Sequence, residues 1–254
     1  MMTFISCAKT MTARTKIKFP ETTVPHFQKE ARENALYMNQ FTAEELGRML
    51  KVNAKLAAEN RLRYQDFLSP NTPSLPALLA YTGMVFKRIH PADFTTEDFR
   101  FAQQHLLITS FLYGLLRPLD AIRNYRMEGY IRLPEHQHQT QFDYWKPILT
   151  DYFIDAVRQQ GGILINLASG EMKDLFHWDK VCREVQVITP EFYTLKNGKP
   201  TTVVVYAKMC RGEMTRFILK NRIEQPEQLK AFEWEGFSYD AASSDTQTLR
   251  FLLK

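Results

Sequence analysis

The chain has 254 residues, of which 44% are hydrophobic and 24% are charged, and only ten are glycine. This composition is typical of a globular protein with an ample core, and it argues against a disordered or loop-rich chain. The formal net charge of +5 favours anionic partners such as nucleic acid, although many basic proteins bind none.

The cysteines, the apolar runs and the N-terminal segment indicate the compartment in which the protein works. Cys7, Cys182 and Cys210 are odd in number and widely spaced, which predicts neither a disulfide framework nor a zinc ribbon and favours a reducing cytosol. No apolar run approaches the roughly 18 residues that a membrane helix needs. The N-terminal MMTFISCAKT has no basic region and no long apolar region, so it predicts a first strand and not a signal peptide. We therefore expect a cytoplasmic protein with no membrane partner.

The first third of the chain predicts a strand followed by helices. Thr3–Ser6 is an apolar strand candidate, and residues 27–40 are expected to be helical. Thr42 and Glu45 have the spacing of a capping box, in which the side chain of each residue accepts a hydrogen bond from the backbone N–H of the other. The helix that follows is expected to keep one apolar face as far as Leu56.

Further helix starts lie at Ser74 and Thr95. The helix from Ser74 is expected to reach Val85 with a proline in its first turn, and Thr95 with Asp98 suggests another cap. Residues 105–112 (HLLITSFL) predict a buried strand. The remaining predicted elements are a helix at 142–160, a strand at 163–167, strands over 184–208 around the Asn197-Gly198 turn, a helix at about 211–221 and a pair of strands within 237–253. No repeat or linker interrupts this order, so the sequence predicts one mixed α/β domain over residues 1–254, a mixed sheet flanked by helices.

Polar groups gather where predicted strands give way to helices. The three segments are Ser6–Thr10, Asn166–Glu171 and Tyr206–Gly212. Ligand clefts in α/β sheets are common at strand ends, and free N–H groups at a helix start favour a phosphate. The expected phosphate contacts from these segments are Lys9, Thr10, Ser169, Lys208 and Arg211. At each segment the alternative is ordinary capping and surface charge.

A charged, irregular segment follows the predicted central strand. It carries arginines, acids and a tyrosine within twelve residues, namely Arg117, Asp120, Arg123, Tyr125, Arg126 and Glu128. Arginine offers a planar fork suited to phosphate, and tyrosine can stack on a base. The alternative is an internal network of arginines and acids that rigidifies the segment, and one network can serve both purposes.

Other candidate motifs predict little chemistry. His136 and His138 share strand parity, but no third ligand is close in sequence, so we expect a polar loop and no metal site. No nucleotide-binding, nucleophile-elbow or metalloprotease motif is present, and no cofactor is expected. Cys7, near Lys9, suggests either a thiol of lowered pKa or a small residue at a tight turn, and we expect the second.

Six segments in this order resemble the YaaA peroxide-stress family. They are ISCAKT at 5–10, PALLAYTGMVF at 76–86, LYGLLRPLDAIRNYRMEG at 112–129, INLASGEM at 165–172, YAKMCRGEMTRFI at 206–218 and EGFSYDAASS at 235–244. The resemblance implies a bacterial, cytoplasmic protein of the hydrogen-peroxide response that lowers free intracellular iron and so limits oxidative DNA damage. It also implies DNA binding, an unusual α/β fold with a basic cleft, and a helix-hairpin-helix-like element.

The chain departs from the family's usual pattern at four positions within or beside these segments. Cys7 and Asn124 stand where the family usually has proline, Met84 where it has aspartate, and Phe111 where it has glycine. The missing acid at position 84 weakens any catalytic or metal-binding role for that position.

Two functions follow from the residues and the resemblance. The first is a DNA-binding protein for double-stranded or structured DNA without sequence preference, in which the basic residues, Arg117 and Arg126 included, contact phosphates and Tyr125 stacks. The alternative is an enzyme that acts on a nucleic-acid base or a nucleotide, with Asp120, Glu128 or Glu171 as acid or base. Direct iron sequestration ranks lowest, because the chain offers few clustered ligands.

Overall fold

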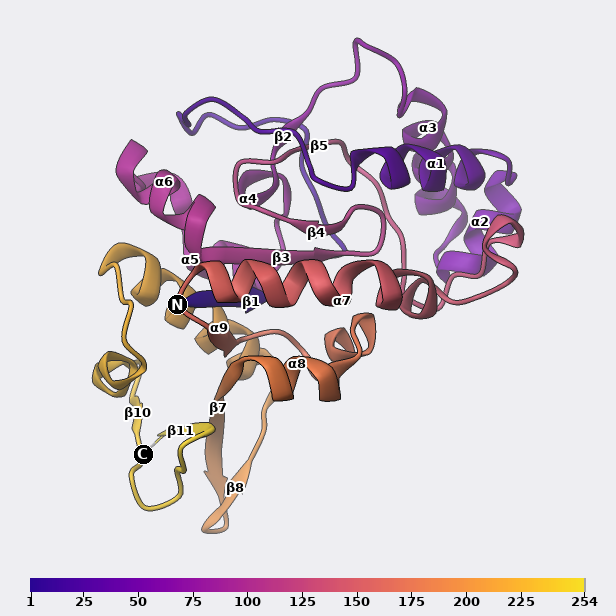
Figure 1. Cartoon of the computed structure of the whole chain (residues 1–254). Helices are drawn as coiled ribbons and strands as arrows, with labels where there is room; N and C mark the ends of the chain where they lie inside the picture. The colour runs from indigo at the N-terminus through magenta and orange to yellow at the C-terminus, as the bar shows by residue number, and fades with distance from the viewer. Residues whose placement is uncertain (254) are drawn as a thin grey trace.

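A mixed sheet runs through the middle of the molecule (Figure 1). The computed structural model describes residues 1–253, and Lys254, the last residue of the predicted domain, lies outside them. Among residues 1–253 the sheet has nine strands, which confirms the predicted mixed α/β class. Its order is β4 (Gly114–Leu116), β3 (Leu106–Ser110), β1 (Met2–Ile5), β6 (Ile163–Asn166), β7 (Gln186–Lys196), β11 (Thr248–Leu253), β10 (Phe237–Tyr239) and β9 (Glu233–Trp234), with β8 (Lys199–Thr201) paired to β7.

The central strands are parallel and the outer ones antiparallel. Strand β1 pairs in parallel with β3 and β6, and β7 continues the parallel set to β11. Strands β1 and β3 are buried along their whole length, as expected of parallel strands covered on both faces. Thr3 lies opposite both Leu106 and Ile165, so the carboxyl ends of the three strands meet at one edge of the sheet.

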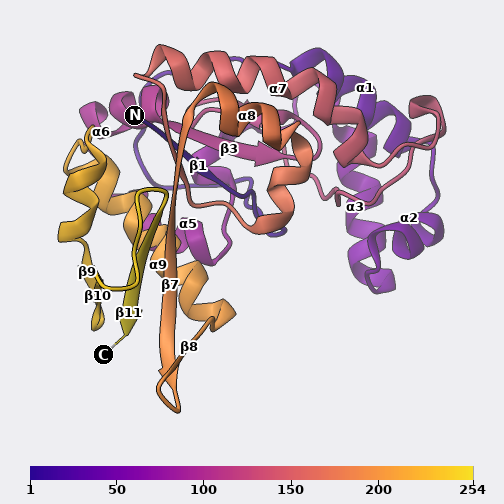
Figure 2. The same ribbon diagram turned by 60° about the horizontal axis from the view of Figure 1, so that its bottom comes forward.

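Helices cover both faces of this sheet. In Figure 2, α7 and α8 lie on one side of the strands and α5 and α9 on the other, while α1, α2 and α3 gather beyond one end. The helices are α1 (Gln28–Asn39), α2 (Ala43–Leu50), α3 (Ala54–Asp66), α4 (Ala77–Ala80), α5 (Met84–Ile89), α6 (Thr96–His105), α7 (Gln141–Gln159), α8 (Trp178–Glu184) and α9 (Val204–Lys220). Short 3₁₀ helices are η1 (Pro91–Asp93), η2 (Pro134–His136), η3 (Gly170–Leu175) and η4 (Pro226–Ala231), and β2 (Leu75–Pro76) pairs with β5 (Ala121–Ile122).

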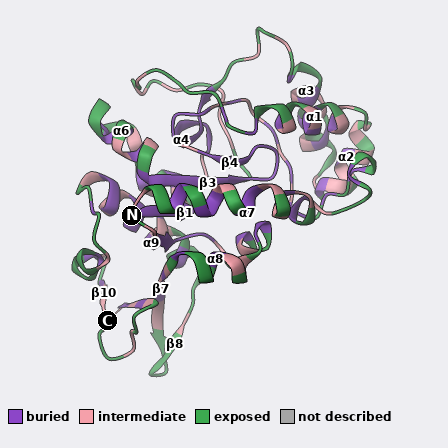
Figure 3. Cartoon of the chain, viewed as in Figure 1, coloured by how far each residue is buried: buried purple, intermediate pink, exposed green. Residues whose placement is uncertain are grey.

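One hydrophobic core joins these layers. Figure 3 shows burial concentrated in the central strands and on the inner sides of the helices, whereas the outer end of the β7–β8 hairpin is exposed. Trp145 and Phe153 of α7, which corresponds to the helix predicted at 142–160, are fully buried. None of the helices within residues 1–253 combines the length and apolar character required to span a lipid bilayer.

Several predictions made from local sequence signals are confirmed. The Thr42 and Thr95 capping boxes are both formed, with Glu45 and Asp98 as the returning acids. Gly198 lies in the turn between β7 and β8 with a φ of 73°. These signals succeed because each depends on backbone groups only a few residues away.

Three predicted helix boundaries are wrong. The helix after Thr42 stops at Leu50, because Lys51 adopts a left-handed φ of 52° and Asn53 caps a new helix. Ser74 caps no helix, since the adjoining Leu75–Pro76 pairs with Ala121–Ile122 as a strand and α4 is a single turn.

The third error concerns α9. Residues 204–208 are helical and not a strand, so Tyr206–Gly212 lies inside a helix and is not a junction between strand and helix. The run of β-branched residues favours a strand locally. Packing overrides that preference, because α9 lies closely against α5 at Gly212.

Gly212→Ala should lower the free energy of unfolding by roughly 1–3 kcal/mol through overpacking. A Cβ at this position would lie 2.5 Å from Cβ of Arg88 and still closer to the carbonyl oxygen of Val85, which is backbone and cannot move aside cheaply. Urea denaturation measures the change. Gly170→Ala is the control, because its Cβ would meet nothing within 4 Å. Equal stability of the two variants would contradict close packing of α5 and α9.

Candidate functional site

A cavity of about 610 Å³ lies at the carboxyl edge of the parallel strands. Ser6, Phe111 and Leu167 line it, and each directly follows the end of β1, β3 or β6. This edge is where open α/β sheets bind ligands, because the chain leaves neighbouring strands there in different directions. The parallel register of β1, β3 and β6 therefore determines where the cavity lies.

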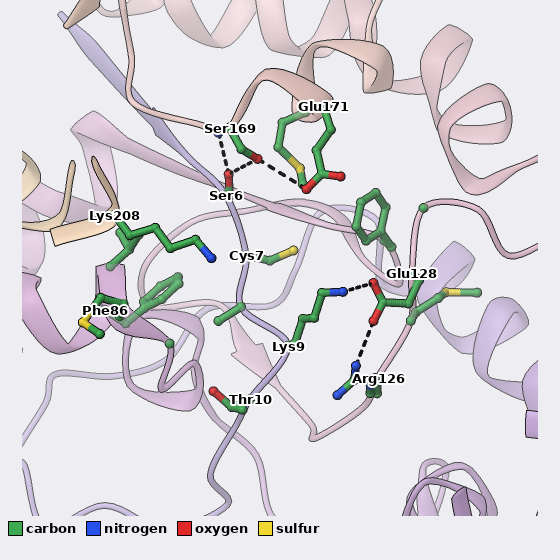
Figure 4. A pocket seen from close by; sticks show the side chains of 18 of the residues that line it. Ser6, Cys7, Lys9, Thr10, Phe86, Arg126, Glu128, Ser169, Glu171 and Lys208 are labelled. Atoms are coloured by element: carbon green, nitrogen blue, oxygen red, sulfur yellow. Dashed lines mark hydrogen bonds and ion pairs between the residues drawn. The ribbon is translucent and has the colours of Figure 1, made fainter. Parts of the chain in front are cut away.

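Elements from other parts of the chain complete the walls. Helix α9 contributes Lys208 and Arg211, α5 contributes residues 84–86, and the end of α2 contributes residues 49–51. The extended segment 125–130 forms the side opposite α9, as the labelled residues of Figure 4 show. The site is thus assembled from segments more than 200 residues apart.

Two serines tie the ends of β1 and β6 together. The backbone N–H of Ser169 donates to Oγ of Ser6 at 2.8 Å, and the two hydroxyl oxygens lie 3.1 Å apart (Figure 4). The N–H of Cys7 donates to Oγ1 of Thr109 at 3.0 Å, which links β1 to β3 in the same way. These bonds hold the floor of the cavity in one geometry.

An ion cluster occupies one wall. Glu128 accepts from Nζ of Lys9 at 2.8 Å and from Nη2 of Arg126 at 3.1 Å (Figure 4). Glu128 and Arg126 are mostly buried, whereas the Lys9 side chain is largely exposed. Nε of Arg126 is buried and, within the described residues, has no hydrogen-bond partner. The cluster thus holds two cations in the cavity by means of one acid.

Helix α9 carries two cations that are not neutralised in this way. Lys208 and Arg211 are three residues apart and so share a face of the helix. Within residues 1–253 neither side chain forms an ion pair, and the Lys208 ammonium points into the cavity in Figure 4. Burial lowers the pKa of Arg211, which shows that its guanidinium is partly desolvated. Glu191 acts on Arg211 only at longer range, so a partly desolvated guanidinium and an exposed ammonium without ion pairs in the described part of the chain favour an anionic ligand.

Cations outnumber acids around the cavity. Among the described lining residues there are five cationic side chains, namely Lys9, Lys51, Arg126, Lys208 and Arg211, against the two acids Glu128 and Glu171. Glu171 is exposed, and its Oε1 lies 3.5 Å from the Ser169 hydroxyl.

Comparison with known proteins places this chain among its relatives. Residues 1–243 match the family described as peroxide stress protein YaaA. The chain belongs to this family. A UPF0246 protein of Phocaeicola vulgatus is 68% identical over 254 residues and covers both chains fully. UPF0246 proteins of Bacteroides thetaiotaomicron and Porphyromonas gingivalis are 61% and 43% identical, with 99% and 100% of this chain covered and 98% and 100% of theirs. The family is that of a peroxide stress protein, which supports an oxidative-stress role.

The structure brings most of the predicted site residues together. Of the eleven candidates, nine line the cavity within the described chain, namely Lys9, Thr10, Tyr125, Arg126, Glu128, Ser169, Glu171, Lys208 and Arg211. Arg117 and Asp120 do not line it. Lys51, Met84, Phe86 and Phe111 were not among the candidates, because an aliphatic, aromatic or isolated basic residue has no local signal for a cavity wall.

Of the four positions at which the family resemblance is imperfect, Cys7, Met84 and Phe111 line the cavity, and Asn124 lies elsewhere.

Asp120 braces the charged segment from inside. It is 4% exposed, its Oδ2 accepts the N–H of Arg117 at 2.7 Å, and its Oδ1 accepts the Thr23 hydroxyl at 2.7 Å. Burial raises its pKa from the usual value. Asp120 thus serves the internal network that was the alternative for this segment, and it lies outside the cavity in which an acid or base role was expected of it.

Tyr125 is also held in the core. Its side chain is 4% exposed, and its hydroxyl lies 2.6 Å from those of Tyr81 and Ser110. Burial raises the pKa of Tyr125 well above its usual value. The ring is packed among core side chains and reaches the cavity with only a small part of its surface, so the structure does not favour the predicted stacking on a base.

The remaining sequence candidates carry no reactive chemistry. His136 lies in η2 and His138 in the turn after it, which agrees with the expected loop, and the ring of His136 stacks on Tyr144 with 3.6 Å between the ring centroids. Within residues 1–253 no three His, Cys, Asp or Glu side chains cluster as metal ligands. Burial raises the pKa of Cys7 to about 11, and a thiol of lowered pKa is thereby contradicted.

Asp120→Ala should lower the free energy of unfolding by about 1–3 kcal/mol, because two donors lose a buried acceptor. Affinity of the cavity for anionic ligands should stay the same, since the carboxylate lies outside it. Urea denaturation and inorganic-phosphate binding measure the two effects. Glu171→Ala is the matched control, and its stability should change by less than about 0.5 kcal/mol because the residue is exposed. A stable Asp120→Ala protein with altered binding would contradict the bracing role.

Proposed function

We propose that this protein binds DNA in the peroxide-stress response and so protects it from oxidative damage. The partner is double-stranded or structured DNA, read through its phosphates and without sequence preference. The observation that carries the proposal is the pair of cations on α9, Lys208 and Arg211, which enter the cavity without ion-pair partners among the described residues.

The chemistry of the cavity supports a phosphate ligand. An arginine fork and a lysine ammonium on one helix face match the oxygens of a phosphodiester. The Ser6 and Ser169 hydroxyls and Thr10 add neutral hydrogen-bonding groups to the lining. The surplus of cations around the cavity and the net charge of +5 both favour a polyanion. We call this site a basic cleft on these grounds.

Lys9 and Arg126 have a different place in the proposal. Both are bound to Glu128, so a phosphate competes with that carboxylate for them. Their contribution to DNA affinity is therefore smaller than that of Lys208 and Arg211. Arg117 lies outside the cavity and contributes only if the DNA extends beyond it.

The lower free iron implied by the family resemblance is part of the same proposal. Free iron can be measured by electron paramagnetic resonance in cells that lack the protein and are complemented with the wild type or with Lys208→Ala/Arg211→Ala. If the protein lowers free iron by binding DNA, the double variant should fail to lower the iron signal. Full restoration by that variant would separate the effect on iron from the cleft.

A second candidate function is an enzyme that acts on a base or a nucleotide. The exposed Glu171 carboxylate favours it, because this acid lines the cavity, has no ion pair among the described residues and lies beside the Ser169 hydroxyl. A binding site for phosphate alone has no use for such an acid. In this scheme Glu171 or Glu128 transfers the proton, and the cations of α9 hold the phosphate.

Lys208→Ala/Arg211→Ala should weaken duplex binding by roughly 10- to 60-fold at about 0.1 M salt, because two phosphate contacts and their released counterions are lost. The slope of log K against log salt should become shallower by about two. Fluorescence anisotropy over a salt series measures both. Lys29→Ala removes an exposed lysine that does not line the cavity, and it should bind like the wild type. Equal losses of duplex affinity in the double variant and in Lys29→Ala would indicate that DNA binding depends only on the overall charge of the protein.

Glu128→Gln separates the two candidate functions. For a binding protein, DNA affinity should rise by about 3- to 10-fold, because Lys9 and Arg126 are freed and one repulsive charge is removed. For an enzyme, turnover of modified DNA or nucleotides should fall, whereas binding is kept or strengthened. Binding assays and product analysis by mass spectrometry measure the two, with Glu171→Gln in parallel. Unchanged affinity and an absence of turnover in every protein would contradict both roles for Glu128.

A further inference from the structure

We infer that the cavity receives a single nucleotide swung out of a DNA duplex, and that the first turn of α9 supports the opened stack. This inference rests on the proposed function and specifies which part of the DNA enters the site.

The size of the cavity is the first argument. Cavities of about 300–1,000 Å³ enclose ligands of drug-like size, a class that includes one nucleotide. The observed volume of about 610 Å³ falls within this range. A duplex is far too wide to enter, since its major groove alone measures about 12 Å across. Intact duplex therefore reaches only the mouth, and the inner residues meet DNA only if one nucleotide leaves the stack.

The composition of the walls is the second argument. A groove that held only a phosphate backbone would need cations and little else. The lining of this cavity also includes the buried apolar side chains Phe86, Phe111, Met127 and Met172. Figure 4 shows Phe86 in the same cavity as Ser6 and Glu128. Apolar walls with a few fixed polar groups suit a heteroaromatic base, whose faces are apolar and whose edges form hydrogen bonds. The cations of α9 then hold the phosphate of the same nucleotide.

The first turn of α9 is both apolar and exposed. Val204 and Val205 are 63% and 53% exposed, and the flanking Val203 and Tyr206 are exposed as well. A run of exposed β-branched residues is unfavourable in the first turn of a helix. Val204, Lys208 and Arg211 lie at positions i, i+4 and i+7, so this apolar turn continues the face that carries the phosphate-binding cations.

DNA is the occupant that this juxtaposition favours. Proteins that open a base step insert apolar side chains into it while nearby cations hold the phosphates. Val204 and Val205 supply the exposed apolar part, and Lys208 and Arg211 in the next turns of the same helix line the cavity. The two valines thus fill the gap that the extruded nucleotide leaves in the base stack, and the cavity holds that nucleotide.

The test uses duplexes that carry 2-aminopurine at one central position, because this base becomes fluorescent when it leaves the stack. One duplex pairs it with thymine and the other mispairs it with cytosine. We expect fluorescence to rise several-fold when the full-length protein binds. We also expect roughly tenfold tighter binding of the mispaired duplex, because a mispaired base is easier to extrude.

Two variants locate the effect. Met84 is 39% exposed on the cavity wall, and Met84→Trp should fill the space. This variant should lose both the fluorescence rise and the preference for the mispair, and any duplex binding that it keeps comes from contacts at the mouth of the cavity. Val204→Ala/Val205→Ala should reduce the fluorescence rise while keeping the helix, since alanine is a strong helix former. Val24→Ala, at an exposed valine outside the cavity, is the control.

The outcomes separate this inference from the proposed function. Binding of both duplexes with equal affinity and without a fluorescence rise would overturn the inference and leave DNA binding intact. A wild-type fluorescence rise with Met84→Trp would also overturn it, because the nucleotide would then occupy another place. Failure to bind any duplex at low salt would overturn the proposed function itself.

Discussion

The site depends on the parallel pairing of β1 with β3 and β6. Because the three strands run in one direction, the chain leaves them at the same edge and delivers Ser6, Phe111 and Leu167 to one place. An antiparallel arrangement would send one of these ends to the opposite edge. The serine pair and the Cys7–Thr109 bond then fix the spacing of the ends, so the floor is rigid before any ligand arrives.

The balance of charge in the cavity follows from which cations have acids beside them. Glu128 neutralises part of the wall formed by Lys9 and Arg126, whereas Lys208 and Arg211 on α9 form no ion pair among the described residues. A ligand anion meets the α9 cations without first displacing a carboxylate. Glu128 thus orders Lys9 and Arg126, and the wall that it neutralises differs in charge from the wall formed by α9.

The position of α9 connects the fold to the proposed function. Gly212 allows α9 to lie against α5, and that contact holds Lys208 and Arg211 on the wall of the cavity, while the first turn of α9 is exposed. The same contact places Met84 and Phe86 of α5 on the wall beside them. Membership of the YaaA family supplies the peroxide-stress context, and the arrangement of α5 and α9 supplies the chemistry proposed within it.

Local patterns in the sequence determined the α/β class, the buried strands, the capping boxes and most of the charged site residues, because each depends on neighbours a few positions away. Tertiary structure decided which of these residues meet. It excluded Arg117 and Asp120, buried Tyr125 in a hydroxyl network and made a helix of residues 204–208. Contacts between residues more than a hundred positions apart produce no local pattern in the sequence. The apolar lining of the cavity and the exposed first turn of α9 could therefore be recognised only in the tertiary structure.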